Sequence, residues 1–188
     1  MSEANSNYRN KKWIFINIFF VLMLFPFFTW SAEFVQRESG ESIQTFAQSA
    51  LPKDAELVDP VVEVTVQKSS HAVVAIYRNK NQSTNFSGLV LFPEEKSQKY
   101  RVTHLAPMKE ADGLFDIEVK SVFTAKTKLH NNNGLVILYS YYRLGSGEEG
   151  GNAGYFYHLE GDSWKIDEGL SERLVDVENA KQARAKLK

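Results

Sequence analysis

The pattern of apolar residues after residue 60 constrains the fold of this chain more than any other feature. Val62, Val64 and Val66 alternate with polar residues, which is the period of a half-buried β-strand. Similar segments follow at intervals of roughly 10–15 residues, and their connections are too short for the helical crossovers that parallel strands need. The pattern predicts about seven or eight strands in a mainly antiparallel sheet. The expected strands cover residues 62–67, 72–77, 88–92, 100–105, 115–120, 135–142, 155–159 and 163–166.

Two short helices are expected outside the strands. In residues 41–50 apolar side chains recur at helical spacing, Ser39 or Ser42 is available as the N-cap, and Pro52 ends the helix. Residues 179–188 have helical composition, with acidic side chains before the start and lysines near the end. The sequence thus predicts an α+β domain, mainly antiparallel β-sheet, built as one curved sheet or a two-layer sandwich with an N-terminal and a C-terminal helix.

The N-terminus has the pattern of a targeting segment. Arg9, Lys11 and Lys12 precede residues 13–30, which carry no charge and are rich in phenylalanine. A basic stretch followed by such a run is typical of a secretory signal peptide, and the run is also long enough to serve as a transmembrane anchor. Both interpretations place the following residues across the inner membrane, because the basic flank stays in the cytoplasm.

Cleavage of this segment is expected between Ser31 and Ala32. Pro26 breaks the helix before the site, and Thr29 and Ser31 place small residues at the −3 and −1 positions. The predicted organisation is therefore a signal peptide or anchor over residues 1–31 and a single exported domain over residues 32–188. We expect a periplasmic or secreted protein, or one anchored to the inner membrane by residues 13–30 if cleavage does not occur.

Composition excludes several functions. With 22 basic and 23 acidic residues the net charge is −1, which gives no electrostatic basis for nucleic-acid binding. The chain has no cysteine, so disulfides, thiol catalysis and thiolate metal sites are absent. The exported domain must therefore be held together by its apolar core alone.

A glycine-rich segment after residue 144 resembles a dinucleotide-binding pattern only superficially. Residues 145–150 read Gly-Ser-Gly-Glu-Glu-Gly, but the residues that follow would not start the helix that such a site requires, and Glu148 and Glu149 would repel phosphate. We expect no cofactor. The simplest interpretation of residues 145–154 is a mobile hairpin connection; a ligand-binding loop is the alternative.

No catalytic or metal site can be read from residue spacing. His71, His104, His130 and His158 are scattered without HxH or HExxH spacing, so only the fold could bring them together, and we expect no metal. No G-x-S-x-G nucleophile motif is present. The expected function is therefore a non-catalytic binding or accessory module of a bacterial-type envelope. The alternatives are an envelope hydrolase that uses His104 or His158 with a carboxylate, and a membrane-tethered structural protein.

The binding surface is expected around the glycine-rich segment and the aromatic strand after it. Exposed tyrosines supply apolar area together with a hydrogen-bonding group, and sheet edges and aromatic strand faces suit a protein partner, here another envelope protein. The candidate binding residues are Tyr141, Tyr142, Glu148, Glu149, Tyr155 and Tyr157.

Overall fold

The computed structural model describes residues 33–67, 70–79, 86–94, 97–106, 114–143 and 150–188. They belong to one compact unit, Ala32–Lys188. The strands are β1 (Phe34–Gln36), β2 (Ala55–Gln67), β3 (Ser70–Asn79), β4 (Phe86–Pro93), β5 (Lys99–His104), β6 (Leu114–Ala125), β7 (Gly134–Arg143), β8 (Gly150–Glu160) and β9 (Ser163–Ile166). The helices are α2 (Ile43–Ser49), α3 (Glu168–Glu172) and α4 (Ala180–Lys186).

The strands form two antiparallel sheets. The first sheet has the order β1-β5-β4-β3-β2, and the second has the order β6-β7-β8-β9. Every strand pairing in the described ranges is antiparallel, which confirms the predicted fold class. Residues 34–36 pair with β5 and bring the described strands to nine, where seven or eight were expected.

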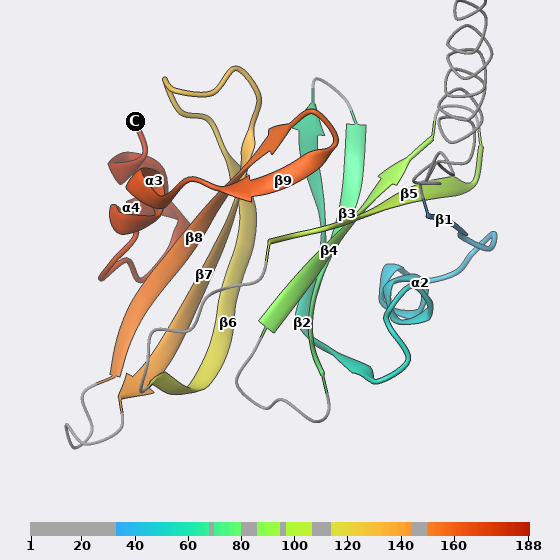
Figure 1. The fold of residues 1–188 in the computed structure, drawn as a ribbon, viewed down its shortest axis with the longest axis horizontal. Helices are drawn as coiled ribbons and strands as arrows, with labels where there is room; N and C mark the ends of the chain where they lie inside the picture. The colour runs from blue at the N-terminus through green and yellow to red at the C-terminus, as the bar shows by residue number, and fades with distance from the viewer. Residues whose placement is uncertain (1–32, 68–69, 80–85, 95–96, 107–113, 144–149) are drawn as a thin grey trace, which may run out of the picture. The chain divides into compact units, whose positions relative to one another are not determined.

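The two sheets enclose the central core; α2 lies on the outer face of the first sheet, and α3 and α4 lie on the outer face of the second (Figure 1). Because the strands of both sheets have an apolar layer on either side, their middle segments are apolar on both faces. In β3, for example, Val74 faces the central core and Val73 faces α2. The central core contains Val64, Val66, Ala72, Val74, Ile76, Phe86, Val90, Phe92, Leu105, Val119, Val122, Leu135, Ile137, Tyr157 and Trp164.

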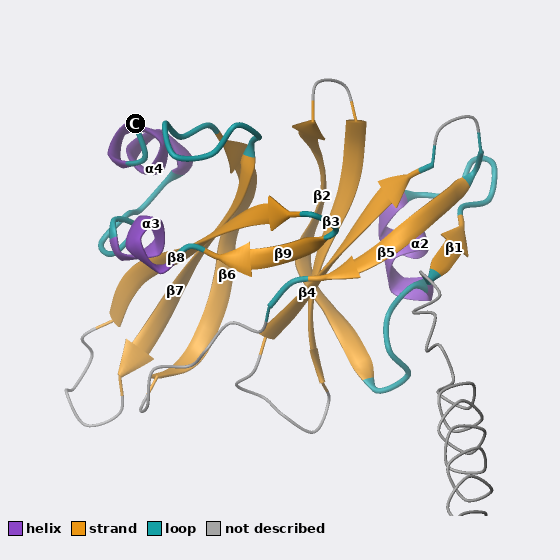
Figure 2. Cartoon of the chain, turned by 45° about the horizontal axis from the view of Figure 1, so that its top comes forward, coloured by secondary structure: helices purple, strands orange, loops and turns teal. Residues whose placement is uncertain are grey.

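Helix α2 covers the outer face of the first sheet. Its buried residues Phe46 and Ala47 pack on that face, and the Oγ of Ser42 accepts a hydrogen bond from the amide of Thr45 at the N-cap. Helices α3 and α4 cover the outer face of the second sheet, on the opposite side of the domain (Figure 2). The expected helices are both present, and α3 is an additional element that is too short to show a sequence period.

The connection between β6 and β7 is rich in asparagine, a residue that tolerates left-handed backbone, but it turns the chain without it. In the described ranges, only Gly40, Gly161 and Asp176 have positive φ, so the Asn-rich turn before Gly134 does not use it. Gly134 is required for another reason. A Cβ at this position would lie 2.0 Å from Cζ of Phe156, whose ring packs over the glycine.

The expected loop over residues 145–154 is wrong for its last five residues. Strand β8 begins at Gly150, and Gly151 pairs with Tyr141 on β7. The ring of Tyr141 lies over Gly151, so a neighbouring aromatic side chain covers backbone that the glycine leaves bare. The glycine content predicted a loop. This prediction was wrong because the sequence does not reveal that an aromatic ring on the neighbouring strand packs over the glycines.

Candidate functional site

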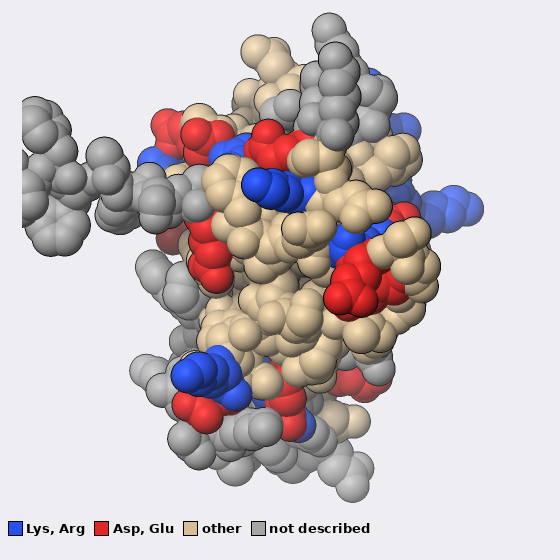
Figure 3. Space-filling model, turned by 90° about the vertical axis from the view of Figure 1, so that its right-hand side faces the viewer, with Lys and Arg blue, Asp and Glu red and all other residues tan. Residues whose placement is uncertain are grey.

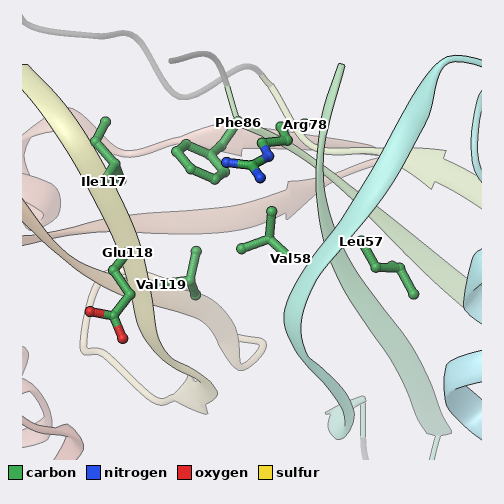
Figure 4. A pocket seen from close by; sticks show the side chains of 7 residues that line it. All are labelled: Leu57, Val58, Arg78, Phe86, Ile117, Glu118 and Val119. Atoms are coloured by element: carbon green, nitrogen blue, oxygen red, sulfur yellow. The ribbon is translucent and has the colours of Figure 1, made fainter. Parts of the chain in front are cut away.

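A pocket lies between the two sheets and is lined by residues of β2, β3, β4 and β6. It has a volume of about 440 Å³ and combines apolar side chains of both sheets with two charged residues (Figure 4). Val58 and Phe86 come from the first sheet, and Ile117 and Val119 come from the second. Leu57 also lines the pocket but points away from the others, toward the layer that contains α2.

Arg78 is the basic residue of this pocket. It is the cross-strand partner of Phe86, and its side chain runs beside that ring. Its Nε donates to Oε1 of Glu56, which fixes the guanidinium at the mouth. The acidic residue Glu118 is exposed and paired with Lys120. The pocket is therefore an open hollow that combines apolar side chains of both sheets with one basic and one acidic residue.

The charged side chains around the first sheet are mixed in sign. On the face shown in Figure 3, acidic and basic residues lie next to one another in small groups, and uncharged residues, drawn in tan, lie between these groups. Ion pairs that involve residues of the first sheet include Arg37–Glu63 and Arg101–Asp162. This visible face offers no continuous basic surface to a polyanion.

The tyrosines proposed from the sequence are divided between core and surface. Tyr157 is fully buried in the central core, where its hydroxyl donates to the carbonyl oxygen of Ala106. Tyr155 is partly buried and stacks on Tyr139 with ring centroids 5.6 Å apart. Burial raises the pKa of Tyr139 and of Tyr157, and the neighbouring Tyr155 raises both further. The aromatic strand therefore contributes mainly to the core.

Tyr141 and Tyr142 lie at a second, shallower hollow. It has a volume of about 270 Å³ and is bordered by the two glycines that start β8 and by Asn152. Tyr142 is 46% exposed. These two tyrosines are the members of the expected binding surface that lie at a surface depression. Glu148 and Glu149 lie outside the described residues, as do Ser31, Ala32 and the whole of residues 13–30.

A cluster of two histidines and one aspartate lies on the outer face of the second sheet. His130 comes from the β6–β7 connection, His158 from β8, and Asp167 from the residue directly before α3. Nε2 of His130 donates to Oδ2 of Asp167 at 2.9 Å, and the two imidazole rings stack with centroids 4.4 Å apart. One ligand atom from each of the three residues lies within 4.8 Å of the other two.

The cluster shifts two pKa values. Burial lowers the pKa of the His158 imidazole, and the nearby His130 lowers it further, against the opposing effect of Asp167. Burial alone would raise the pKa of Asp167, but hydrogen bonds from His130 and from the Leu170 amide outweigh it and keep that pKa below its ordinary value. The neutral imidazole and the ionised carboxylate are thus the favoured forms, and these forms bind metal ions.

Residue spacing did not indicate this cluster. The sequence suggests His158 as a base beside a carboxylate, gives no reason to expect metal binding by the four scattered histidines, and does not single out Asp167. His71 and His104 are exposed and lie outside the cluster. An N-cap signal at Asp167 was available in the sequence, but nothing local connects it with His130, which is 37 residues away.

Comparison with known proteins gives no information about the function of this protein. No known protein family, curated protein or solved structure matches this sequence at a significant level. Within the described ranges, no helix is both long enough and apolar enough to span a membrane.

Proposed function

We propose that residues 32–188 are a non-catalytic binding module exported into the envelope of a bacterial-type cell, and that the pocket between β2 and β6 receives part of its partner. The observation that supports this function is the pocket itself. It is an open hollow of about 440 Å³ in which apolar side chains of both sheets, such as Val58 and Ile117, lie beside the charged residues Arg78 and Glu118.

The proposed occupant is an apolar side chain on an extended segment of another envelope protein. β2 and β6 are the terminal strands of their sheets, and such strands can pair with an added strand. Register irregularities occur beside the pocket in both, between Val58 and Val62 and between Phe115 and Glu118. Bulges of this kind limit pairing along an edge, so the pocket would supply most of the affinity.

Site-specific crosslinking in the native cell tests this proposal. A photoreactive phenylalanine analogue replaces Arg78, whose side chain lies beside Phe86 in the pocket, and a matched control carries it at Val175, which is 46% exposed. We expect one covalent partner from position 78 and none from 175, with the product lost when Ile117→Trp fills the pocket. Equal products from both positions, or a product that survives Ile117→Trp in a folded variant, would refute the pocket as the binding site.

Export is tested separately by the intact mass of the protein in soluble and membrane fractions. A soluble periplasmic or secreted species that begins at Ala32 is expected if the signal is cleaved, and a full-length membrane species is expected if it remains as an anchor. Full-length protein confined to the soluble cytoplasm would contradict export.

An envelope hydrolase is the second candidate, and one observation favours it. The fold places His158, which has a lowered pKa, beside a carboxylate and a second imidazole. Such a group is a candidate general base. Hydrolysis of a cell-wall glycan or peptide that is lost in His158→Gln, but kept in His104→Gln, would support this candidate over the binding module.

A further inference from the structure

The three residues His130, His158 and Asp167 meet only because the second sheet folds as it does. β8 and β9 form a hairpin in which His158 pairs with Lys165, and this pairing brings the residues after β9 back beside β8. The backbone amide of Asp167 donates to the carbonyl oxygen of Phe156 at 2.9 Å. The cluster lies on the face of the second sheet that α3 covers, whereas the pocket proposed above lies between the sheets.

The geometry points to a divalent transition-metal site at His130, His158 and Asp167. Two imidazoles and one carboxylate are a ligand set that binds Zn²⁺ and related ions, with at least one coordination position left for water or substrate. The three residues come from three different segments, and each has a ligand atom in the cluster. All three are only partly buried, so an ion can reach them from solvent.

The separation of the ligand atoms is compatible with one ion after a small adjustment. In the tetrahedral geometry that Zn²⁺ favours, ligand atoms about 2.1 Å from the ion lie about 3.4 Å from one another. A pair at the present limit of 4.8 Å therefore has to approach by about 1.4 Å or less. Rotation of an imidazole about its side-chain torsions covers this distance. Nε2 of His130 and Oδ2 of Asp167 are joined by a hydrogen bond of 2.9 Å, so an ion that binds both atoms replaces the proton between them.

The surrounding residues hold two of the ligands in place. Oδ1 of Asp167 accepts from the amide of Leu170 at 3.0 Å, which leaves Oδ2 directed at His130. The amide of His130 donates to Oγ1 of Thr127, and the imidazole of His130 stacks on Phe156. Such outer contacts orient ligands and are a regular part of protein metal sites.

His158 provides a further, independent observation. Its Nδ1 is buried and has no hydrogen-bond partner among the described residues. Buried polar atoms without a partner are uncommon and call for an explanation, such as an ion that is bound when the protein functions. If the hydrogen bond between His130 and Asp167 had only a structural role, it would link the β6–β7 connection to α3. It would not explain why the His158 imidazole lies beside this pair with Nδ1 unbonded.

The test is a Zn²⁺ titration of the full-length chain, purified in detergent without a polyhistidine tag and stripped with EDTA. Calorimetry in competition with a chelator of known affinity should show one ion per chain. His158→Gln and Asp167→Asn should each weaken binding by at least about 100-fold, since removal of a ligand costs no less than removal of its outer contacts. Asparagine is as good an N-cap as aspartate, so Asp167→Asn preserves the start of α3. His104→Gln is the matched control and should bind as the wild type does.

A second readout does not depend on any variant being folded. In the wild-type chain, Zn²⁺ should shift the ring-nitrogen NMR signals of His130 and His158 and leave those of His71 and His104 unchanged. Absence of stoichiometric binding, an equal loss of affinity in His104→Gln, or ring shifts confined to the other two histidines would overturn the proposal. Failure at this site would leave the pocket between the sheets, and the function proposed for it, unaffected.

Discussion

At the scale of single residues, contacts between a few side chains determine the packing on the outer face of the second sheet. Gly134 leaves the space that the ring of Phe156 fills, and the same ring supports the imidazole of His130. One missing Cβ therefore sets the position of a candidate metal ligand. The buried Nδ1 of His158 and the lowered pKa of that imidazole come from the same crowded environment.

Gly134→Ala is expected to destabilise the domain by about 1–3 kcal/mol, because the new methyl group overlaps a packed ring. Urea denaturation followed by circular dichroism measures the change. Gly169→Ala in α3 is the matched control. Its Cβ would meet only Asp167 Oδ1 at 3.6 Å, so this variant should be as stable as the wild type or slightly more stable. Equal losses in both variants would show that the Phe156 contact is not the cause.

The pH dependence of stability should contain a contribution from His158 when metal is removed by EDTA. The groups that face this imidazole are His130, Asp167, Glu160 and Lys165. Because folding lowers its pKa, the unfolded chain takes up the proton more readily, and stability decreases as pH falls below the ordinary histidine pKa of about 6.5. The decrease in Tm between pH 7.5 and pH 5.5 should be smaller in His158→Gln than in the wild type. A decrease of the same size in both would contradict this account.

At the scale of elements, the caps explain why short helices form where they do. Asp167 begins α3 by accepting from the amide of Leu170, and Asn179 begins α4 by accepting from the amides of Lys181 and Gln182. Both helices are too short to be stable in isolation, so packing on the second sheet stabilises them. Ala183 and Leu187 are fully or almost fully buried in that contact.

Asn179→Ala should reduce the free energy of unfolding by about 1 kcal/mol, since alanine cannot accept the two amide hydrogen bonds. Asn179→Asp keeps the acceptor and should retain most of the stability. Chemical denaturation of the two variants in parallel separates loss of the cap from any general effect of the position. A loss in the aspartate variant as large as in the alanine variant would argue against the cap.

At the scale of the whole domain, the two sheets share one core. Ile76 in the first sheet and Ile137 in the second belong to the same central cluster, and both are fully buried. Arg101 on β5 also donates to Asp162 in the β8–β9 turn at 2.6 Å. This ion pair is exposed and adds little, so the apolar contact between the sheets provides most of their attachment.

Ile76→Ala and Ile137→Ala should each cost about 2–5 kcal/mol and lower the midpoint of a single unfolding transition. Fluorescence and far-UV circular dichroism should report the same midpoint, because a shared core makes the sheets unfold together. Val175→Ala, at an exposed position, should change stability by less than about 0.5 kcal/mol. Two separate transitions, each sensitive to one isoleucine, would show that the sheets are independent.

The elements themselves were largely predictable, and the errors have local causes. The alternation at Ile117, Glu118 and Val119 predicted both the strand and its buried face correctly. In a strand, consecutive side chains point to opposite faces, so the alternation can be recognised from neighbouring residues alone. The start of β8 was missed because cross-strand tyrosines, and not its own glycines, make it a strand. The sequence places Tyr157 on a strand. It does not show that the side chain faces the central core, because that depends on which sheet covers the strand.

The sequence by itself determined the antiparallel β-rich class, most strand positions and the helices α2 and α4, since these depend on local periodicity, caps and short connections. Only the tertiary structure decided that the strands divide into two sheets, that a pocket opens between β2 and β6, and that His130, His158 and Asp167 come together. The physical reason is that strand pairing and face-to-face packing join residues far apart in the chain, whereas hydrophobic periodicity specifies that a face is buried without specifying its partner.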